Sequence, residues 1–478
     1  MEAITTAAGS VEGGIVPAPG DLAGVHQALA SVRPASTGAG MINQLRMLED
    51  LKSLAAAKEA EIAVAFDLSR RQDQAAAGGR ADELGAGVGS EIALARRESP
   101  ARGGRLLGQA KALATEMPRT LAALRSGQLN EWRATLIVKE TACLSAEDRC
   151  AVDEEMAVDT GTLSGCGDRA IIAAVRAAAY RRDPHSVAKR ASHAISERTV
   201  TLRPAPDTMT RLTALLPVAQ GVAVFAALTR HADSARSKGD ERSKGAIMAD
   251  QLVESVTGTP AGISGIEIQL VMTDRTLFQG DSEPARLAGY GIVPAEWARK
   301  AVLDQEPETG ELTTWLRRLY TAPGTGDLLA MDSKARLFPP GLRRYLQVRD
   351  DTCRTPYCDA PIRHHDHIIP WHQHGPTTST NGQGLCEACN HTKETPGWTT
   401  HTVPGPRHTV QLRSPTGHTY HSTAPPPPGT VSAATPDGSA RRRNVHPQLR
   451  ASATRSRLVD HERPKPAVEV LGRVVPAR

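Results

Sequence analysis

Residues 353–393 read CRTPYCDAPIRHHDHIIPWHQHGPTTSTNGQGLCEACNHTK, and this stretch decides the fold of the C-terminal part of the chain. It holds four of the seven cysteines, as a C-x4-C pair and a C-x2-C pair separated by 27 residues. Each short-spaced pair can present two thiolates from one tight turn, and two such pairs complete the tetrahedral four-sulfur shell of a structural Zn²⁺. We therefore expect a zinc site with the ligands Cys353, Cys358, Cys386 and Cys389, against the alternative of buried free thiols.

The other three cysteines, Cys143, Cys150 and Cys166, fall in a region of helical pattern. Small buried hydrophobic residues are the simplest reading of them. An odd cysteine number, in a chain whose first residues show no secretory signal, disfavours a disulfide scaffold. We expect a cytoplasmic protein.

The polar residues between and after the cysteine pairs carry a second pattern. Asp366-His367-Ile368-Ile369-Pro370 is followed by Asn381, and the second cysteine pair is followed by Asn390 and Lys393. This ordered set resembles the zinc-bound form of the HNH endonuclease motif. The resemblance implies a small ββα-metal (His-Me finger) nuclease domain that hydrolyses DNA with a divalent metal and leaves a 5′ phosphate.

Physical chemistry supplies a reason for each of these residues. Histidine can activate water near neutral pH because its unperturbed pKa is about 6.5, so His367 is the expected general base. Asp366 and Asn390 offer oxygen ligands, which suit Mg²⁺ or Mn²⁺ at the scissile phosphate. Asn381 is expected either to hold the imidazole of His367 through a hydrogen bond or to fix the loop beside it.

Two alternatives stay open within this pattern. The founding motif has histidine directly after the last cysteine, where this chain has Asn390, so it resembles the HNN variant of the family. His391 is the other candidate metal ligand, about 100° further round a helix. A shifted register, with His364 and His365 as the catalytic pair, is the second alternative, but Ile368-Ile369-Pro370 anchors the register on His367.

Basic residues surround the motif. Arg349, Arg354, Arg363 and Lys393 are the expected contacts to the backbone of DNA, or of RNA, since phosphate neutralisation by arginine and lysine dominates nucleic-acid affinity. A solvated charged face is the alternative. The net charge of +5 lies mostly in residues 424–478, where ten Lys and Arg stand against four Asp and Glu.

The rest of the chain favours helices. Apolar residues at spacings of three, four and seven predict a helix over about 41–66, and further helices are expected at 91–116, 118–140, 145–158, 167–193 and 208–235. The segment 74–89 reads as a loop, and short runs at 198–202 and 266–272 read as strands. We expect an α+β protein: a disordered leader (1–38), a mainly helical domain (39–325), the nuclease domain (326–405) and a disordered Pro-rich basic tail (424–478).

Further segments extend the resemblance beyond the nuclease motif. They are Met117-Pro118 with Gly127-Gln128-Leu129, Gly289-Tyr290-Gly291-Ile292-Val293-Pro294, and the approach to the first cysteine pair from Leu328 to Arg354. They are similar to actinobacterial HNH proteins that carry an N-terminal domain of unknown function 222. The resemblance implies no function for the helical domain.

Composition excludes some classes of protein. The mean hydropathy is −0.33, and the longest apolar stretch, Leu215 to Leu228, is interrupted by Pro217 and Gln220. It is shorter than the roughly 20 residues of a membrane span. Gly85-x-Gly87-x-Gly89 follows no predicted strand, which disfavours nucleotide binding. Two rivals to the nuclease remain: a non-catalytic zinc finger that binds nucleic acid, and a helical interaction module with a degenerate nuclease attached. The oligomeric state is left open.

Overall fold

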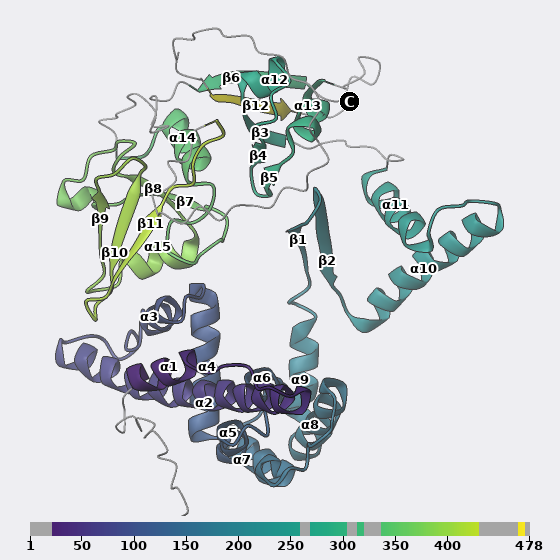
Figure 1. Ribbon diagram of the computed structural model, residues 1–478, viewed down its shortest axis with the longest axis vertical. Coiled ribbons are helices and arrows are strands. Elements are labelled where there is room, and N and C mark those ends of the chain that lie inside the picture. Colours follow the sequence, from purple (N-terminus) through teal and green to yellow (C-terminus); the bar gives the residue numbers. More distant parts are fainter. Residues whose placement is uncertain (1–21, 259–267, 304–312, 320–335, 430–466, 474–478) are drawn as a thin grey trace, which may run out of the picture. The chain divides into compact units, whose positions relative to one another are not determined.

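The fold is taken from a computed structural model, which describes residues 22–258, 268–303, 313–319, 336–429 and 467–473 (Figure 1). These residues form two compact units. The first combines residues up to 62 with 112–182, and the second combines 63–111 with 183 onward. Each unit is described by itself.

The first unit is helical. It contains α1 (Leu22–Ala30), most of α2 (Gly38–Ala76), the end of α4 (Pro100–Thr115), and then α5 (Pro118–Arg125), α6 (Glu131–Glu140), α7 (Ala146–Met156), η1 (Val158–Thr160) and α8 (Asp168–Arg182). Its core is built from small and aliphatic side chains, among them Met117, Leu129, Ile137, Ile171 and Val175. Capping residues fix the helix starts: the side chains of Asn130 and Ser145 accept hydrogen bonds from backbone amides three residues later.

Several predicted helices are confirmed but are divided in the structure. The range 91–116 contains α3 (Val88–Ala95) and α4, because Pro100 starts a new helix. The range 118–140 is split at Gly127, whose φ of +78° is left-handed. A Cβ on Gly127 would lie 2.6 Å from the Asp50 carboxylate, so only glycine fits this break.

The expected disordered leader is wrong for residues 22–30, which form α1, and α2 begins at Gly38. Residues 1–21 of that leader lie outside the described residues, as do residues 328–335 of the extended resemblance and most of the expected tail. The predicted domain boundaries themselves stay predictions.

The helix predicted over 208–235 is wrong in its first part. Residues Met209–Leu215 form β2, which pairs antiparallel with β1 (Thr199–Ala205), and α10 (Val218–Ser237) starts only after Pro217. Proline has no backbone amide proton and clashes with the preceding helical turn, so a helix cannot run through Pro217 at this place. Before α10 lies α9 (Pro184–Ala194), and after it α11 (Lys244–Thr257).

A five-stranded sheet follows in the second unit, with the order β5-β4-β3-β12-β6. Its strands are β3 (Ile268–Thr273), β4 (Ala285–Leu287), β5 (Gly291–Val293), β6 (Thr313–Leu319) and β12 (Ala467–Arg473). Helices α12 (Asp274–Phe278) and α13 (Ala295–Leu303) pack against β3 and β4 through Leu277 and Ala298. Strand β12 lies in the range expected to be a disordered tail, so that expectation is wrong for 467–473.

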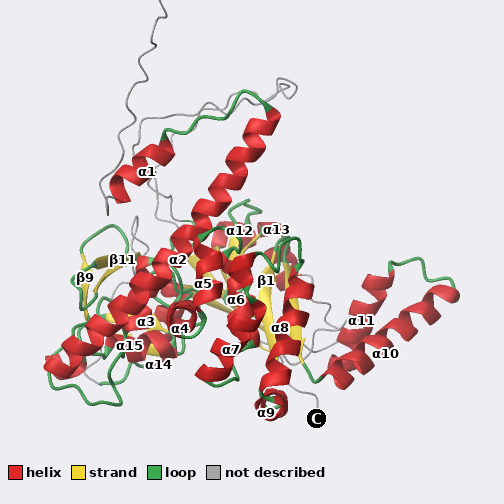
Figure 2. Cartoon of the chain, turned by 90° about the horizontal axis from the view of Figure 1, so that it is seen from below, coloured by secondary structure: helices red, strands yellow, loops and turns green. Residues whose placement is uncertain are grey.

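The candidate site lies in residues 336–429. Helix α14 (Pro340–Asp350) is followed by the strand pair β7 (His364–His367) and β8 (Gly382–Leu385), with η2 (Trp371–Gln373) between them. Helix α15 (Glu387–Lys393) follows β8, and the strands β9 (Thr399–Val403), β10 (Thr409–Arg413) and β11 (Thr419–Thr423) form a separate meander. The predicted α+β class is thereby confirmed, with helices dominating the N-terminal region and small sheets the C-terminal region (Figure 2).

Among the described helices, none combines the length and the apolar character that crossing a membrane would require.

Candidate functional site

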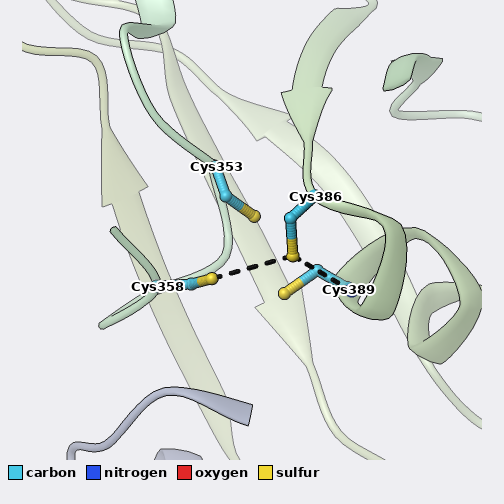
Figure 3. Close-up of side chains that lie close together, drawn as sticks. All are labelled: Cys353, Cys358, Cys386 and Cys389. Carbon is cyan, nitrogen blue, oxygen red and sulfur yellow. Dashed lines mark hydrogen bonds between the residues drawn. The ribbon is translucent and has the colours of Figure 1, made fainter. Parts of the chain in front are cut away.

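The four motif cysteines come together as the spacing predicted. Their sulfur atoms all lie within 4.8 Å of one another, and all four residues are buried (Figure 3). Sulfur ligands at about 2.3 Å from a tetrahedral zinc stand about 3.8 Å apart, and the Sγ atoms of Cys358 and Cys386 are 3.9 Å apart. The donor set and its geometry fit a closed zinc site.

Backbone hydrogen bonds shape the two cysteine turns. Cys353 and Cys358 lie on a loop closed by bonds from the Cys353 amide to Ala360 O (2.9 Å) and from the Cys358 amide to Thr355 O (3.1 Å). Cys386 is the N-cap of α15, where its sulfur accepts a hydrogen bond from the Cys389 amide. A zinc ion held by these four thiols would tie the loop after α14 to the start of α15.

Hydrogen bonds link the ionisation of three of these thiols, those of Cys353, Cys358 and Cys389. Hydrogen bonds from Cys358 and Cys389 lower the pKa of the Cys353 thiol to about 2. The hydrogen bond between Cys353 and Cys389 raises the pKa of the Cys389 thiol. A single thiolate thus discourages its neighbours from ionising, because buried like charges repel. A bound Zn²⁺ would remove this conflict by neutralising all the thiolates.

Glycines in β8 allow α14 to lie directly on the hairpin. A Cβ on Gly382 would come within 2.8 Å of Leu346 and Phe338, and one on Gly384 would overlap Ile362. Phe338, Leu342, Tyr345 and Leu346 form the buried cluster on this face. The hairpin is consequently held rigidly, which positions the side chains of β7.

A buried carboxylate locks the end of α14 onto the same strand. Asp350 accepts two hydrogen bonds from Arg349 (2.7 and 3.0 Å) and one from the Gly384 amide (2.8 Å). Arg349 also donates to Ser379 O and Gly382 O, and Arg354 donates to His408 O and Ser422 O. Both guanidinium groups are buried. As placed, both side chains face protein oxygens, and this burial does not fit the expected contact to nucleic acid.

His367 lies at the end of β7 in an aromatic slot. Its ring centroid is 4.5 Å from that of Phe338 and 5.9 Å from that of Trp371. The residue is only 8% exposed, and its Nε2 is 2.9 Å from the hydroxyl of buried Thr377. Burial lowers the pKa of His367, with Lys393 and Arg336 adding to the effect and Asp366 opposing it. The lowered pKa favours the neutral imidazole near neutral pH.

Asn381 holds the loop beside this histidine instead of the ring itself. Its Oδ1 accepts from the Ile369 amide (2.9 Å), and its Nδ2 donates to Ile369 O (3.1 Å) and Pro376 O (2.9 Å). Of the two roles expected for Asn381, the geometry matches the second. Thr377 is the actual partner of the ring, and the sequence offered no signal for it within a run of threonines and serines.

Asp366 and Lys393 form an ion pair. Lys393 donates to the Asp366 carboxylate and, at 2.5 Å, to the backbone oxygen of His367. Lys393 is buried, so it does not face solvent as a nucleic-acid contact would. It holds the adjacent catalytic candidates of β7 against α15.

Asn390 offers an unused oxygen. Its Oδ1 is buried and has no hydrogen-bond partner among the described residues. A buried acceptor without a partner is costly, and a cation would satisfy it. Asn390 lines the same cavity as Asp366 and His367, whereas the exposed His391 does not. The oxygen donors of Asp366 and Asn390 suit a hard divalent ion.

These side chains open onto a cavity of about 730 Å³. Three arginines, Arg336, Arg343 and Arg363, line it together with His364, His365 and His372, while Glu394 and Asp366 supply the negative charge. Arg363 is exposed, as its predicted role requires. Arg336 was not among the predicted contacts, because it lies 17 residues before Cys353 with no spacing to mark it.

Comparison with known proteins agrees with this geometry. Residues 48–299 match the family model described as domain of unknown function 222, and residues 353–395 match the model described as HNH endonuclease. The second match covers the zinc site, the β7–β8 hairpin and α15, and it assigns this region to a nuclease family. No curated protein and no solved structure matches the chain.

Proposed function

The chain belongs to the family of the domain of unknown function 222, and from its HNH endonuclease domain and the geometry of that domain we infer that it is a metal-dependent endonuclease that hydrolyses DNA. The observation that carries this proposal is the cavity in which neutral His367, Asp366 and the unpartnered oxygen of Asn390 meet. A zinc-binding scaffold alone would need none of these three side chains.

His367 acts as the general base. Nε2 of His367 lies 2.9 Å from the Thr377 hydroxyl. In the tautomer in which Nε2–H donates to that hydroxyl, Nδ1 carries the lone pair that takes the proton from the attacking water. Phe338 and Trp371 hold the ring and keep its pKa low, so the base is neutral at physiological pH.

Asp366 and Asn390 would hold the divalent ion, and Lys393 keeps the carboxylate of Asp366 in place beside His367. When bound, Mg²⁺ or Mn²⁺ supplies a Lewis acid that stabilises charge on the scissile phosphate and the leaving oxygen. The four cysteines would hold a structural Zn²⁺ that takes no part in the chemistry.

Arg336, Arg343 and Arg363 favour a polyanionic substrate, since they line the cavity as three cations against two carboxylates. In this proposal Arg363 remains a nucleic-acid contact and Arg336 and Arg343 join it, while Arg349, Arg354 and Lys393 support the scaffold.

A plasmid-nicking assay tests the catalytic assignment. Wild-type protein with Mg²⁺ or Mn²⁺ is expected to convert supercoiled plasmid to open circles, and His367→Ala is expected to lower the rate by at least about 100-fold, as loss of a general base does. His401→Ala is the matched control, because His401 is exposed on β9 and does not line the cavity. Wild-type protein that binds DNA but never cleaves it would support the non-catalytic zinc finger instead.

A metal-binding measurement tests the ligands independently of cleavage. Asn390→Ala is expected to weaken Mn²⁺ binding by at least about tenfold, or 1.4 kcal/mol, without loss of zinc. His391→Ala is expected to leave the Mn²⁺ affinity unchanged. The reverse result in titration calorimetry would make His391 the ligand.

A further inference from the structure

The segment from β1 to α11, residues 199–257, exposes many apolar side chains; we call it the arm. Only Ala232 and Ile247 of its four elements are buried. Twelve large hydrophobic residues of the arm are at least 36% exposed, and from Met209 to Thr229 the sequence contains a single charge, Arg211. The longest apolar run of the chain thus faces solvent in the described structure. Extended apolar patches of this kind mark interaction surfaces.

The apolar residues of α10 form a regular stripe. Val218, Val222 and Phe225 are 83%, 63% and 66% exposed, and their spacings of four and three put them on one face of the helix. The same face continues to Thr229 and Ala232, and there α11 packs on it, with Ala232 and Ile247 buried. The face therefore resembles one side of a helix interface of which only the C-terminal half is covered by described residues.

Two further details favour a partner over the uncovered half. Gly221 flanks the stripe and has no atom within 4 Å of the position that a Cβ would take. A glycine in a helix interior costs about 1 kcal/mol relative to alanine, and nothing in the described chain requires it here, whereas close approach of a second helix would. The β1–β2 ribbon adds a second exposed apolar face, which contains the cross-strand pair Leu202 and Leu212 and, beside it, Val200. A two-stranded ribbon is marginally stable without such support.

We propose that the uncovered half of α10 packs against the same surface of a second copy of this chain, forming a two-fold homodimer through the arm. An isologous interface must be complementary to itself, and an uncharged apolar stripe meets this condition because no like charges are brought together. An acidic or basic partner would require opposite charges on the stripe, and it has none.

The α10 stripe and the ribbon face together approach the area that a dimer needs. The three stripe residues and the ribbon residues Val200, Leu202 and Leu212, each with roughly 100 Å² exposed, give on the order of 600 Å² of apolar surface. Standard interfaces bury about 800 Å² per partner, including their polar rim. The proposal is independent of the nuclease function, since none of these residues lines the catalytic cavity.

The test is the molar mass of the full-length chain in solution. Light scattering after size exclusion is expected to give twice the 50.8 kDa of one chain at about 50 µM protein. The double variant Val222→Glu, Phe225→Glu is expected to shift the dissociation constant upward by at least about 100-fold, because it places four carboxylates in the interface.

The matched control is Gln220→Glu, Ala227→Glu. These exposed positions lie on the opposite face of α10, add the same charge, and are expected to leave the dimer intact. Circular dichroism and zinc content establish that both double variants fold. A monomeric wild-type chain at this concentration would overturn the proposal, as would equal dissociation constants for the two double variants. Plasmid nicking by the monomeric variant is scored separately, so failure of the nuclease proposal and failure of the dimer are distinguishable.

Discussion

Three neighbouring side chains set the burial and the hydrogen bonding of His367. None of the three belongs to the recognised motif, and Phe338 also lies far from His367 in the sequence. Phe338 and Trp371 bury the ring, and Thr377 fixes one of its nitrogen atoms. The sequence identified the histidine through the residues around it in the chain, but its environment is assembled by packing. The burial of His367 therefore allows a prediction of the pH dependence of cleavage, which the motif alone does not allow.

We expect the cleavage rate to fall as the pH drops through a value below 6.5. The folded-state pKa of His367 is lowered by burial, so the neutral, basic form persists below the usual pKa of a histidine and is lost only at more acidic pH. A pH–rate profile under single-turnover conditions measures this midpoint. Trp371→Ala, which opens the slot, is expected to move the midpoint upward toward 6.5; a midpoint above 7 in the wild type would contradict the assignment.

At the scale of elements, β8 organises the site although two of its four residues are glycines. Its sequence, Gly382-Gln383-Gly384-Leu385, has low strand propensity and was not predicted as a strand from its own pattern. It pairs with β7 because the glycines admit Leu346 and Ile362 and because Asp350 binds the Gly384 amide. Such close packing is a tertiary effect that sequence periodicity does not record.

Gly384→Ala is expected to destabilise the nuclease region by about 1–3 kcal/mol, since the new methyl group would overlap the Ile362 side chain. Thermal unfolding of the zinc-loaded protein measures the loss. Gly405→Ala is the control, because its nearest neighbour would be Arg407 O at 3.7 Å and its melting temperature should stay within error. Equal effects of the two substitutions would mean that Ile362 does not pack on Gly384 of β8 as described.

The element predictions succeeded where a periodic pattern or a cap marked the element, as for α2, α5 and α7. They failed where non-local pairing decided. Strand β2 has a composition that also suits a helix, and only its register with β1 makes it a strand. Strand β12 lies among residues with a disordered composition, and only its position between β3 and β6 orders it.

For the whole molecule, the cysteine spacing predicted the cluster of four thiols that could hold zinc, because short-spaced pairs constrain geometry locally. Arginine roles were not predictable in the same way. Arg349, Arg354 and Arg363 look alike in sequence, yet the first two are buried around Asp350 and only the third faces the cavity. The sequence shows which residues are charged, whereas only the fold determines which of these charges are buried.

The two compact units are expected to respond differently to loss of zinc. The first unit has its own aliphatic core, whereas the hairpin and α15 in the second unit are joined through four thiols. Calorimetry with a strong chelator should therefore shift one unfolding transition to lower temperature and leave a helical transition in place. Elemental analysis should give one zinc per chain, and Cys386→Ser should lower it; unchanged zinc content in that variant would remove the structural site.

The placement of Asn390 directly after Cys389 on α15 is expected to make the protein sensitive to oxidation. Cys386 caps this helix and Cys389 lies in it, beside the proposed metal ligand Asn390, so loss of a bound zinc is expected to disturb the position of Asn390 as well. Air oxidation of a zinc-free chain would join sulfurs such as those of Cys358 and Cys386, which are only 3.9 Å apart, into a disulfide. Replacing the metal would then restore nothing, and a reductant would have to come first.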